Sequence, residues 1–189
     1  MFTLDEILKR WIPYRLDAIE SLRWAWALAE AGQDAKLEVH VDGRCRLNGN
    51  VAAIANPMIE AGFIHARALL EFLGLAVTRE GRLCAVNRRP GDVAVEAFST
   101  PEVTLQRATP ASVAAAYPGP REEAEESLVA LFQTSNRWLA HVTDGTTSKK
   151  WTDHHIDVAL RGIPVLVHNH LYAPLGLDLP KRNSRISAD

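Results

Sequence analysis

The chain has 189 residues, of which 47% are hydrophobic and 23% are charged, and its net charge is −2. This composition excludes a disordered chain and a protein that binds nucleic acid through overall positive charge, and the length suits one domain. With two cysteines, no signal-peptide pattern and no apolar run long enough to cross a bilayer, we expect a cytoplasmic protein without a membrane partner.

Helices are predicted for the N-terminal part of the chain, over residues 3–31. Thr3 and Glu6 have the spacing of a capping box, which opens a short helix that Pro13 stops or kinks. Apolar residues then recur at three- and four-residue steps as far as Gly32, which is typical of a second, longer helix.

A change to alternating polarity predicts a β-hairpin over residues 36–48. Apolar and polar residues alternate on both sides of Asp42-Gly43, a pair that favours a two-residue type I′ turn. Residues 75–86 have a weaker hairpin pattern, because the Glu-Gly pair at its centre is a poorer turn sequence.

Three core helices are predicted in the rest of the chain, over residues 50–74, 119–142 and 152–172. In the first of them, Asn56 is the candidate N-cap because Pro57 suits the first helical position. Thr152 or Asp153 is the candidate cap of the last one.

The predicted fold class is mainly α: a four- or five-helix bundle with one or two small β-hairpins. It forms a single domain over residues 1–173, and residues 174–189 are expected to be a loose tail. Residues 87–118 contain four prolines and no long periodic run, which predicts an ordered crossing loop with at most one helical turn in DVAVEAF.

Arg137 and His141 are the candidate catalytic residues. At positions i and i+4 of one helix, they share a face with Cβ atoms about 5–6 Å apart. An arginine can hold a phosphate while an imidazole moves a proton, which suits RNA cleavage through the 2′-OH. In the alternative interpretation, His141 interacts with the negative end of the helix dipole and Arg137 faces solvent.

Arg67 is the centre of the candidate binding residues. Its stem lies among apolar neighbours, so we expect a half-buried guanidinium that needs acceptors. Glu60 and Glu71 share its side of the helix, and Asn136 can accept from it if the two helices are neighbours. The alternative is a structural ion pair that fixes the register of the helices.

The histidines near the C-terminus do not predict a metal site. His154 and His155 lie roughly 20 Å from His168 along a helix, and no HxxxH or HExxH spacing occurs. The two cysteines form no CxxC pair. We therefore expect neither a metal nor another cofactor.

IEAGFIHARALLEFLGL, followed by SNRWLAHVT and a tryptophan, resembles the HEPN superfamily over roughly residues 50–172. The resemblance implies a four-helix bundle, often dimeric, of the kind found in toxin–antitoxin and phage-defence systems. Many members are metal-independent ribonucleases with an Arg-x4-6-His motif on a late helix. Here three residues separate Arg137 from His141, so the chain departs from that motif.

Two functions follow from these observations. The first is a non-catalytic binding or dimerisation module, which the short spacing favours, with a second copy or an antitoxin or defence protein as its partner. The second is a metal-independent endoribonuclease of toxin or defence type, with RNA as its partner. Its catalytic residues would be Arg137 and His141, and its binding residues Arg67, Asn136, Glu60 and Glu71.

Overall fold

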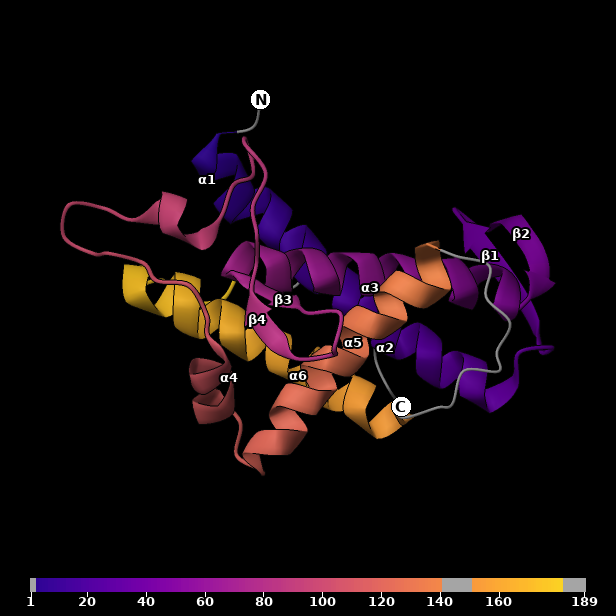
Figure 1. The fold of residues 1–189 in the computed structure, drawn as a ribbon. Helices are drawn as coiled ribbons and strands as arrows, with labels where there is room; N and C mark the ends of the chain where they lie inside the picture. Colours follow the sequence, from indigo (N-terminus) through magenta and orange to yellow (C-terminus); the bar gives the residue numbers. More distant parts are fainter. Residues whose placement is uncertain (1–2, 141–150, 182–189) are drawn as a thin grey trace.

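The computed structural model describes residues 3–140 and 151–181. In this part of the chain, the fold is mainly helical with two small antiparallel two-stranded sheets, so the predicted fold class is confirmed. Helix α3 (Ala52–Leu73) contacts α2 (Ile12–Gly32), α5 (Arg121–Ala140) and α6 (Asp153–Val167), and it forms the centre of the bundle (Figure 1).

The N-terminal helices form one continuous run. The capping box is present, since the Glu6 N–H donates to Thr3 Oγ1 at 3.2 Å and the Thr3 N–H donates to Glu6 Oε2 at 2.8 Å. Helix α1 (Leu4–Glu6) continues into the π-helical turn η1 (Ile7–Trp11) and then into α2. Pro13 therefore does not stop the helix. A proline lacks the N–H that an α-helix requires, and the wider π turn directly before it carries the chain past this missing donor.

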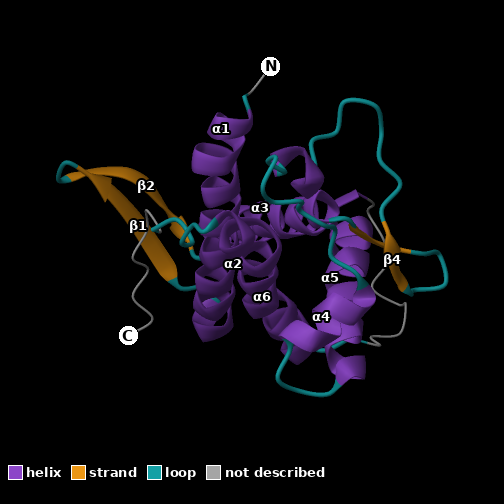
Figure 2. Cartoon of the chain, turned by 90° about the vertical axis from the view of Figure 1, so that its left-hand side faces the viewer, coloured by secondary structure: helices purple, strands orange, loops and turns teal. Residues whose placement is uncertain are grey.

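Both predicted hairpins are present, and Figure 2 shows them on opposite sides of the bundle. Strands β1 (Lys36–Val41) and β2 (Arg44–Asn50) pair through a two-residue turn. Its residues Asp42 and Gly43 have φ values of 50° and 73°, as a type I′ turn requires. Strands β3 (Leu75–Val77) and β4 (Leu83–Ala85) form the second, shorter hairpin.

The start of α3 differs from the prediction. The helix begins at Ala52, so Asn56 is not its N-cap and Pro57 lies inside it. The N-cap residue is Val51, whose side chain cannot accept a hydrogen bond, and the preceding residue supplies the acceptor: Asn50 Oδ1 accepts the Ala53 N–H at 3.1 Å. Pro57 is the sixth residue of the helix, so its missing N–H removes the i→i−4 hydrogen bond to the Ala53 carbonyl from within the helix. The predicted end is confirmed by Gly74, whose φ is 106°.

The segment between β4 and α5 contains more structure than was predicted. The expected helical turn is the 3₁₀ helix η2 (Val95–Phe98), but α4 (Pro110–Ala116) was missed. A helix of seven residues is too short to show a 3.6-residue period. Thr109 caps it, since its Oγ1 accepts the Ser112 N–H at 3.1 Å.

The last predicted helices correspond to α5 and α6. Thr152 is the N-cap of α6, and the π-helical η3 (His168–Tyr172) continues α6 to the predicted end. After the 3₁₀ turn η4 (Ala173–Leu175), the chain has no regular secondary structure as far as Lys181. The end of the predicted tail, 182–189, lies outside the described residues.

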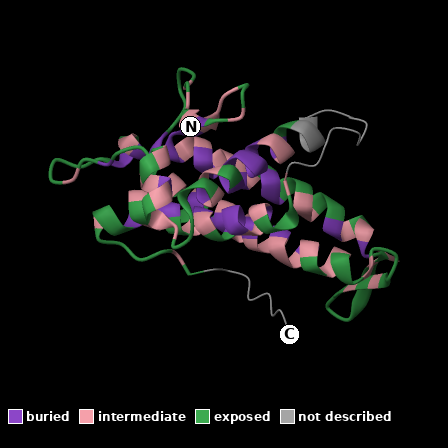
Figure 3. Cartoon of the chain, turned by 60° about the horizontal axis from the view of Figure 1, so that its bottom comes forward, coloured by how far each residue is buried: buried purple, intermediate pink, exposed green. Residues whose placement is uncertain are grey.

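One main apolar core joins all four long helices. Its cluster of buried residues runs from Ile12 to Tyr172. Figure 3 shows the buried residues along the inward faces of the helices, whereas the β1–β2 hairpin is largely exposed. In the described part of the chain, no helix is both long and apolar enough to cross a bilayer.

Candidate functional site

Arg67 joins α3 to α5. Its Nε donates to Glu71 Oε1 at 2.7 Å, one helical turn further along α3, and its Nη1 donates to Asn136 Oδ1 on α5. The predicted proximity of Arg67 to Glu71 and Asn136 is therefore confirmed. The side chains of Arg67 and Glu71 are 39% and 38% exposed, so this group lies at the surface and not in a sealed core.

The other predicted site residues take no part in this group as far as the structure describes them. Glu60 is exposed on α3, about two helical turns before Arg67, and Glu71 is the carboxylate that pairs with the guanidinium. Arg137 belongs to α5, but its side chain lies outside the described residues, as does His141. The pairing of Arg137 with His141 therefore stays a prediction.

The charges and hydrogen bonds of the Arg67–Glu71–Asn136 group are satisfied within the group, as in a contact that joins two helices. The positive charge of Arg67 already faces the Glu71 carboxylate, and the Asn136 amide oxygen takes a second donor. A phosphate at this position would have to compete with that carboxylate for the guanidinium. Nearby on α5, the Ser135 hydroxyl is buried and donates to the Leu131 carbonyl at 2.8 Å. The hydrogen bond from Arg67 on α3 to Asn136 on α5 fixes the register of the two helices.

His65 lies on the other flank of α3, at the boundary with α2. Arg15 Nη1 lies 2.9 Å from its Nδ1, and the ring of Tyr14 packs edge-on against the imidazole at 5.0 Å. Burial lowers the pKa of His65, and the positive charge of Arg15 lowers it further. The neutral ring can accept a hydrogen bond from the guanidinium, which makes His65 a packed boundary residue.

The outward face of α3 was not singled out by the sequence. Ala53, Pro57, Ala61 and Ile64 are all exposed and recur at helical spacing, and Ile64 is 53% exposed. The sequence did contain one indication of this face: Ile64 is apolar but lies on the side of the helix opposite the apolar stripe that contains Phe63 and Leu70. A large apolar side chain that stays exposed on a central helix is typical of a contact surface.

The histidines of α6 are used in contacts between and within helices. His154 Nε2 lies 2.7 Å from Glu123 Oε1 on α5, and His155 Nδ1 lies 2.9 Å from the Thr152 hydroxyl. They do not gather around one point as a metal would require.

A different set could share a cation in the described part of the chain. The ligand atoms of Glu38, His40 and Cys45, on the β1–β2 hairpin, lie within 4.8 Å of one another. All three residues are exposed, because the core does not cover this hairpin.

No family model, no curated protein and no solved structure matches the chain. The resemblance to the HEPN superfamily therefore stays a prediction.

Proposed function

We propose that this protein is a non-catalytic binding module that forms a homodimer through the outward face of α3. The observation that carries the proposal is the exposure of Ile64, at 53%, in the middle of the helix around which the bundle is built. Small neighbours on the same face, Pro57 and Ala61, let a second helix approach closely. A face that meets itself across a twofold axis buries this apolar surface on both copies at once.

The charges beside Ile64 make this face complementary to itself. Glu60 lies one turn before Ile64, and Arg67 lies about one turn after it. When two α3 helices cross antiparallel near Ile64, Glu60 of each copy lies opposite Arg67 of the other. A guanidinium has five N–H donors, and Arg67 uses two of them in hydrogen bonds to described residues of its own chain. The remaining donors can reach the second copy's carboxylate.

Sedimentation equilibrium over a range of concentrations tests the dimer. We expect a dimer for the wild type and a monomer for Ile64→Glu, because the substitution would bury two carboxylates against each other. Val41→Glu is the matched control: Val41 is similarly exposed, at 49%, but lies on the β1–β2 hairpin. If Ile64→Glu dimerises as the wild type does, or if Val41→Glu also becomes monomeric, the assignment to α3 is wrong.

A charge exchange tests the antiparallel register. Glu60→Arg alone and Arg67→Glu alone each place like charges opposite one another, so we expect both to weaken the dimer. An equimolar mixture restores both oppositely charged contacts, and we expect it to form a heterodimer. Association that is equally weak in the mixture would contradict this register.

The charge compensation of Arg67 by Glu71 supports the non-catalytic function over the alternative endoribonuclease. Incubation of the purified protein with structured and single-stranded RNA in EDTA separates the two functions. We expect intact RNA with the wild type and with His141→Ala alike. Cleavage by the wild type that His141→Ala abolishes would establish the nuclease.

A further inference from the structure

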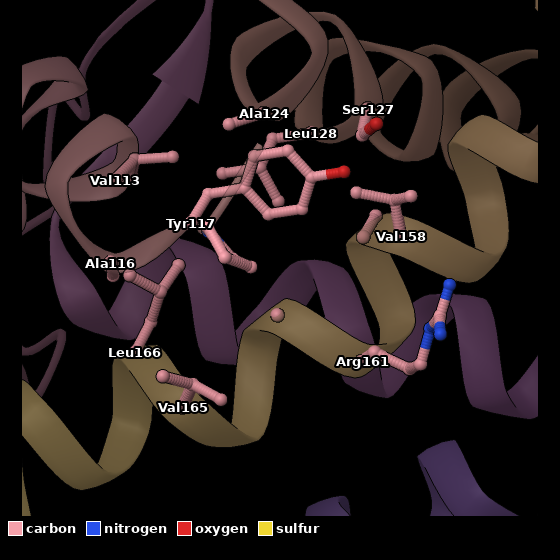
Figure 4. Close-up of a pocket in the computed structure, with 13 residues that line it drawn as sticks. Val113, Ala116, Tyr117, Ala124, Ser127, Leu128, Val158, Arg161, Val165 and Leu166 are labelled. Carbon is pink, nitrogen blue, oxygen red and sulfur yellow. The ribbon is translucent and has the colours of Figure 1, made fainter. Parts of the chain in front are cut away.

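A pocket of about 320 Å³ opens between α4, α5 and α6, away from the outward face of α3 (Figure 4). It exists because the three helices face one another with small residues, namely Ala116, Ala124, Ala159 and Gly162. Larger apolar side chains complete the wall, among them Val113, Leu128 and Leu166. The volume is at the lower end of the range for small-molecule sites, which are also concave and mostly apolar.

The polar groups of the pocket gather at one end. Figure 4 shows Ser127, Arg161 and the hydroxyl of Tyr117 toward the same side, with Val113 and Leu166 toward the other. The Tyr117 hydroxyl is occupied, because it donates to the carboxylate of Glu123. The pocket therefore has an apolar end and a polar end, as a site for an amphipathic molecule requires.

The hydroxyl of Ser127 has no hydrogen-bond partner among the described residues, although the residue is fully buried. Other helical serines of this chain do find one. Ser21 Oγ donates to the Asp17 carbonyl at 3.0 Å, and Ser135 Oγ donates to the Leu131 carbonyl at 2.8 Å. An unpaired buried hydroxyl is costly and calls for a partner that the polypeptide does not supply.

Arg161 provides the charge at the polar end. One of its nitrogens, Nη2, lies 2.6 Å from Asp157 Oδ2, and its side chain is 57% exposed. Among the described residues Asp157 is the one carboxylate paired with Arg161, and a guanidinium so paired retains N–H donors in the geometry that a second carboxylate prefers. The charge of Arg161 therefore complements an anionic group at the mouth of the pocket.

We propose that this pocket binds a medium-chain fatty acid. The acyl chain lies between α4, α5 and α6, and its carboxylate accepts hydrogen bonds from Arg161 and from the Ser127 hydroxyl. The apolar wall excludes a ligand that is charged along its length, and one arginine suits a single carboxylate. This site is separate from the α3 face, so it does not depend on the proposed dimer.

Gly162 allows the pocket to be filled without disturbing the core. A Cβ added at Gly162 would have no atom within 4 Å, and its φ is not in the left-handed region. A phenylalanine at this position can therefore extend into the free space. The variant's melting temperature shows whether it folds, and Gly162→Leu is a smaller substitution for the same purpose.

Calorimetric titration of the full chain with octanoate tests the proposal. We expect saturable binding by the wild type, roughly tenfold tighter than that of hexanoate because two further methylenes are buried. Gly162→Phe and Gly162→Leu should lose binding by at least tenfold. Absence of saturable octanoate binding, or equal binding by the folded Gly162 variants, would overturn the proposal.

The carboxylate contact has its own control. Arg161→Gln should bind octanoate roughly tenfold more weakly but octan-1-ol as the wild type does. Arg23→Gln is the matched variant, because Arg23 also faces Asp157, at 3.6 Å, but does not line this pocket. An equal loss in both arginine variants, or an equal loss of octanoate and octanol binding in Arg161→Gln, would contradict the assigned orientation.

Discussion

Two glycines in central positions of long helices predict opposite responses to the same substitution. Gly62 lies in α3 against α2, and a Cβ added there would be 2.3 Å from Leu22 Cβ and 3.0 Å from the carbonyl oxygen of Ala18. Gly162 lies in α6, where an added Cβ would meet nothing within 4 Å. Gly62→Ala and Gly162→Ala therefore differ only in the space available to one methyl group.

The magnitudes follow from helix propensity and from overpacking. Alanine is better than glycine in a helix interior by about 1 kcal/mol, so Gly162→Ala should raise the free energy of unfolding by about that amount. For a chain of this size, 1 kcal/mol corresponds to roughly 2–4 °C in melting temperature. At Gly62 the gain in propensity is outweighed, because two of the three nearest atoms, Leu22 Cβ and the Ala18 carbonyl oxygen, cannot rotate away. Overpacking costs about 1–3 kcal/mol and occasionally more, and the 2.3 Å approach to Leu22 Cβ places Gly62→Ala in the upper part of this range, at about 2–3 kcal/mol. After the gain of about 1 kcal/mol in propensity, we expect a net loss of about 1–2 kcal/mol.

Urea denaturation and differential scanning calorimetry of the two variants and the wild type measure these changes. The separation between Gly162→Ala and Gly62→Ala should be about 2–3 kcal/mol. If Gly62→Ala is as stable as Gly162→Ala, α2 and α3 do not approach each other as closely as the structure indicates. If Gly162→Ala is destabilising, the space beside α6 is not open, and the pocket argument fails with it.

Three further experiments test the polar contacts. Ser127→Ala should leave the free protein equally or more stable, whereas Ser135→Ala should lose about 1 kcal/mol in chemical denaturation because it removes a made hydrogen bond; equal losses would contradict the unpaired state of Ser127. In a double-mutant cycle of Arg67→Ala and Asn136→Ala, we expect a coupling free energy of about 0.5–1 kcal/mol in stability, which is small because the pair is partly exposed. Additive effects of the two substitutions would contradict a stabilising hydrogen bond between α3 and α5. Because the pKa of His65 is lowered in the folded protein, the unfolded chain binds the proton more readily, and stability should fall as the pH drops below 6.5, the ordinary pKa of histidine. In melting curves at pH 5 to 7.5, His65→Gln should reduce this dependence of stability on pH. An unchanged dependence would exclude His65 as its source.

Local features of the fold could be predicted where a short sequence determines its own backbone. Asp42-Gly43 takes up the two positive φ angles of its turn whatever surrounds it, and Gly74 ends α3 for the same reason. The start of α3 could not be decided in this way. Asn50 and Asn56 can both accept a hydrogen bond from the first turn of a helix, and the use of Asn50 depends on the end of β2, which places its side chain beside the Ala53 N–H.

The site residues show the same division between local and long-range information. For Arg67 and Asn136, 69 residues apart, the sequence indicated a guanidinium in need of acceptors and an amide that could supply one if the two helices were neighbours. The pocket and the exposed Ile64 could not be inferred, since periodicity gives the side of a helix but not the distance to the next one. Gly162 was the indication of the pocket that the sequence contained. A glycine in a helix interior lowers stability by about 1 kcal/mol relative to alanine, so its presence there needs a structural or functional reason. Most of the other α6 residues that line the pocket are also small or β-branched (Val158, Ala159 and Val165), and together they leave room that larger side chains would have filled. On this side of α6, glycine lowers helix propensity and the small side chains leave the space beside the helix unfilled. The proposed ligand would occupy that space.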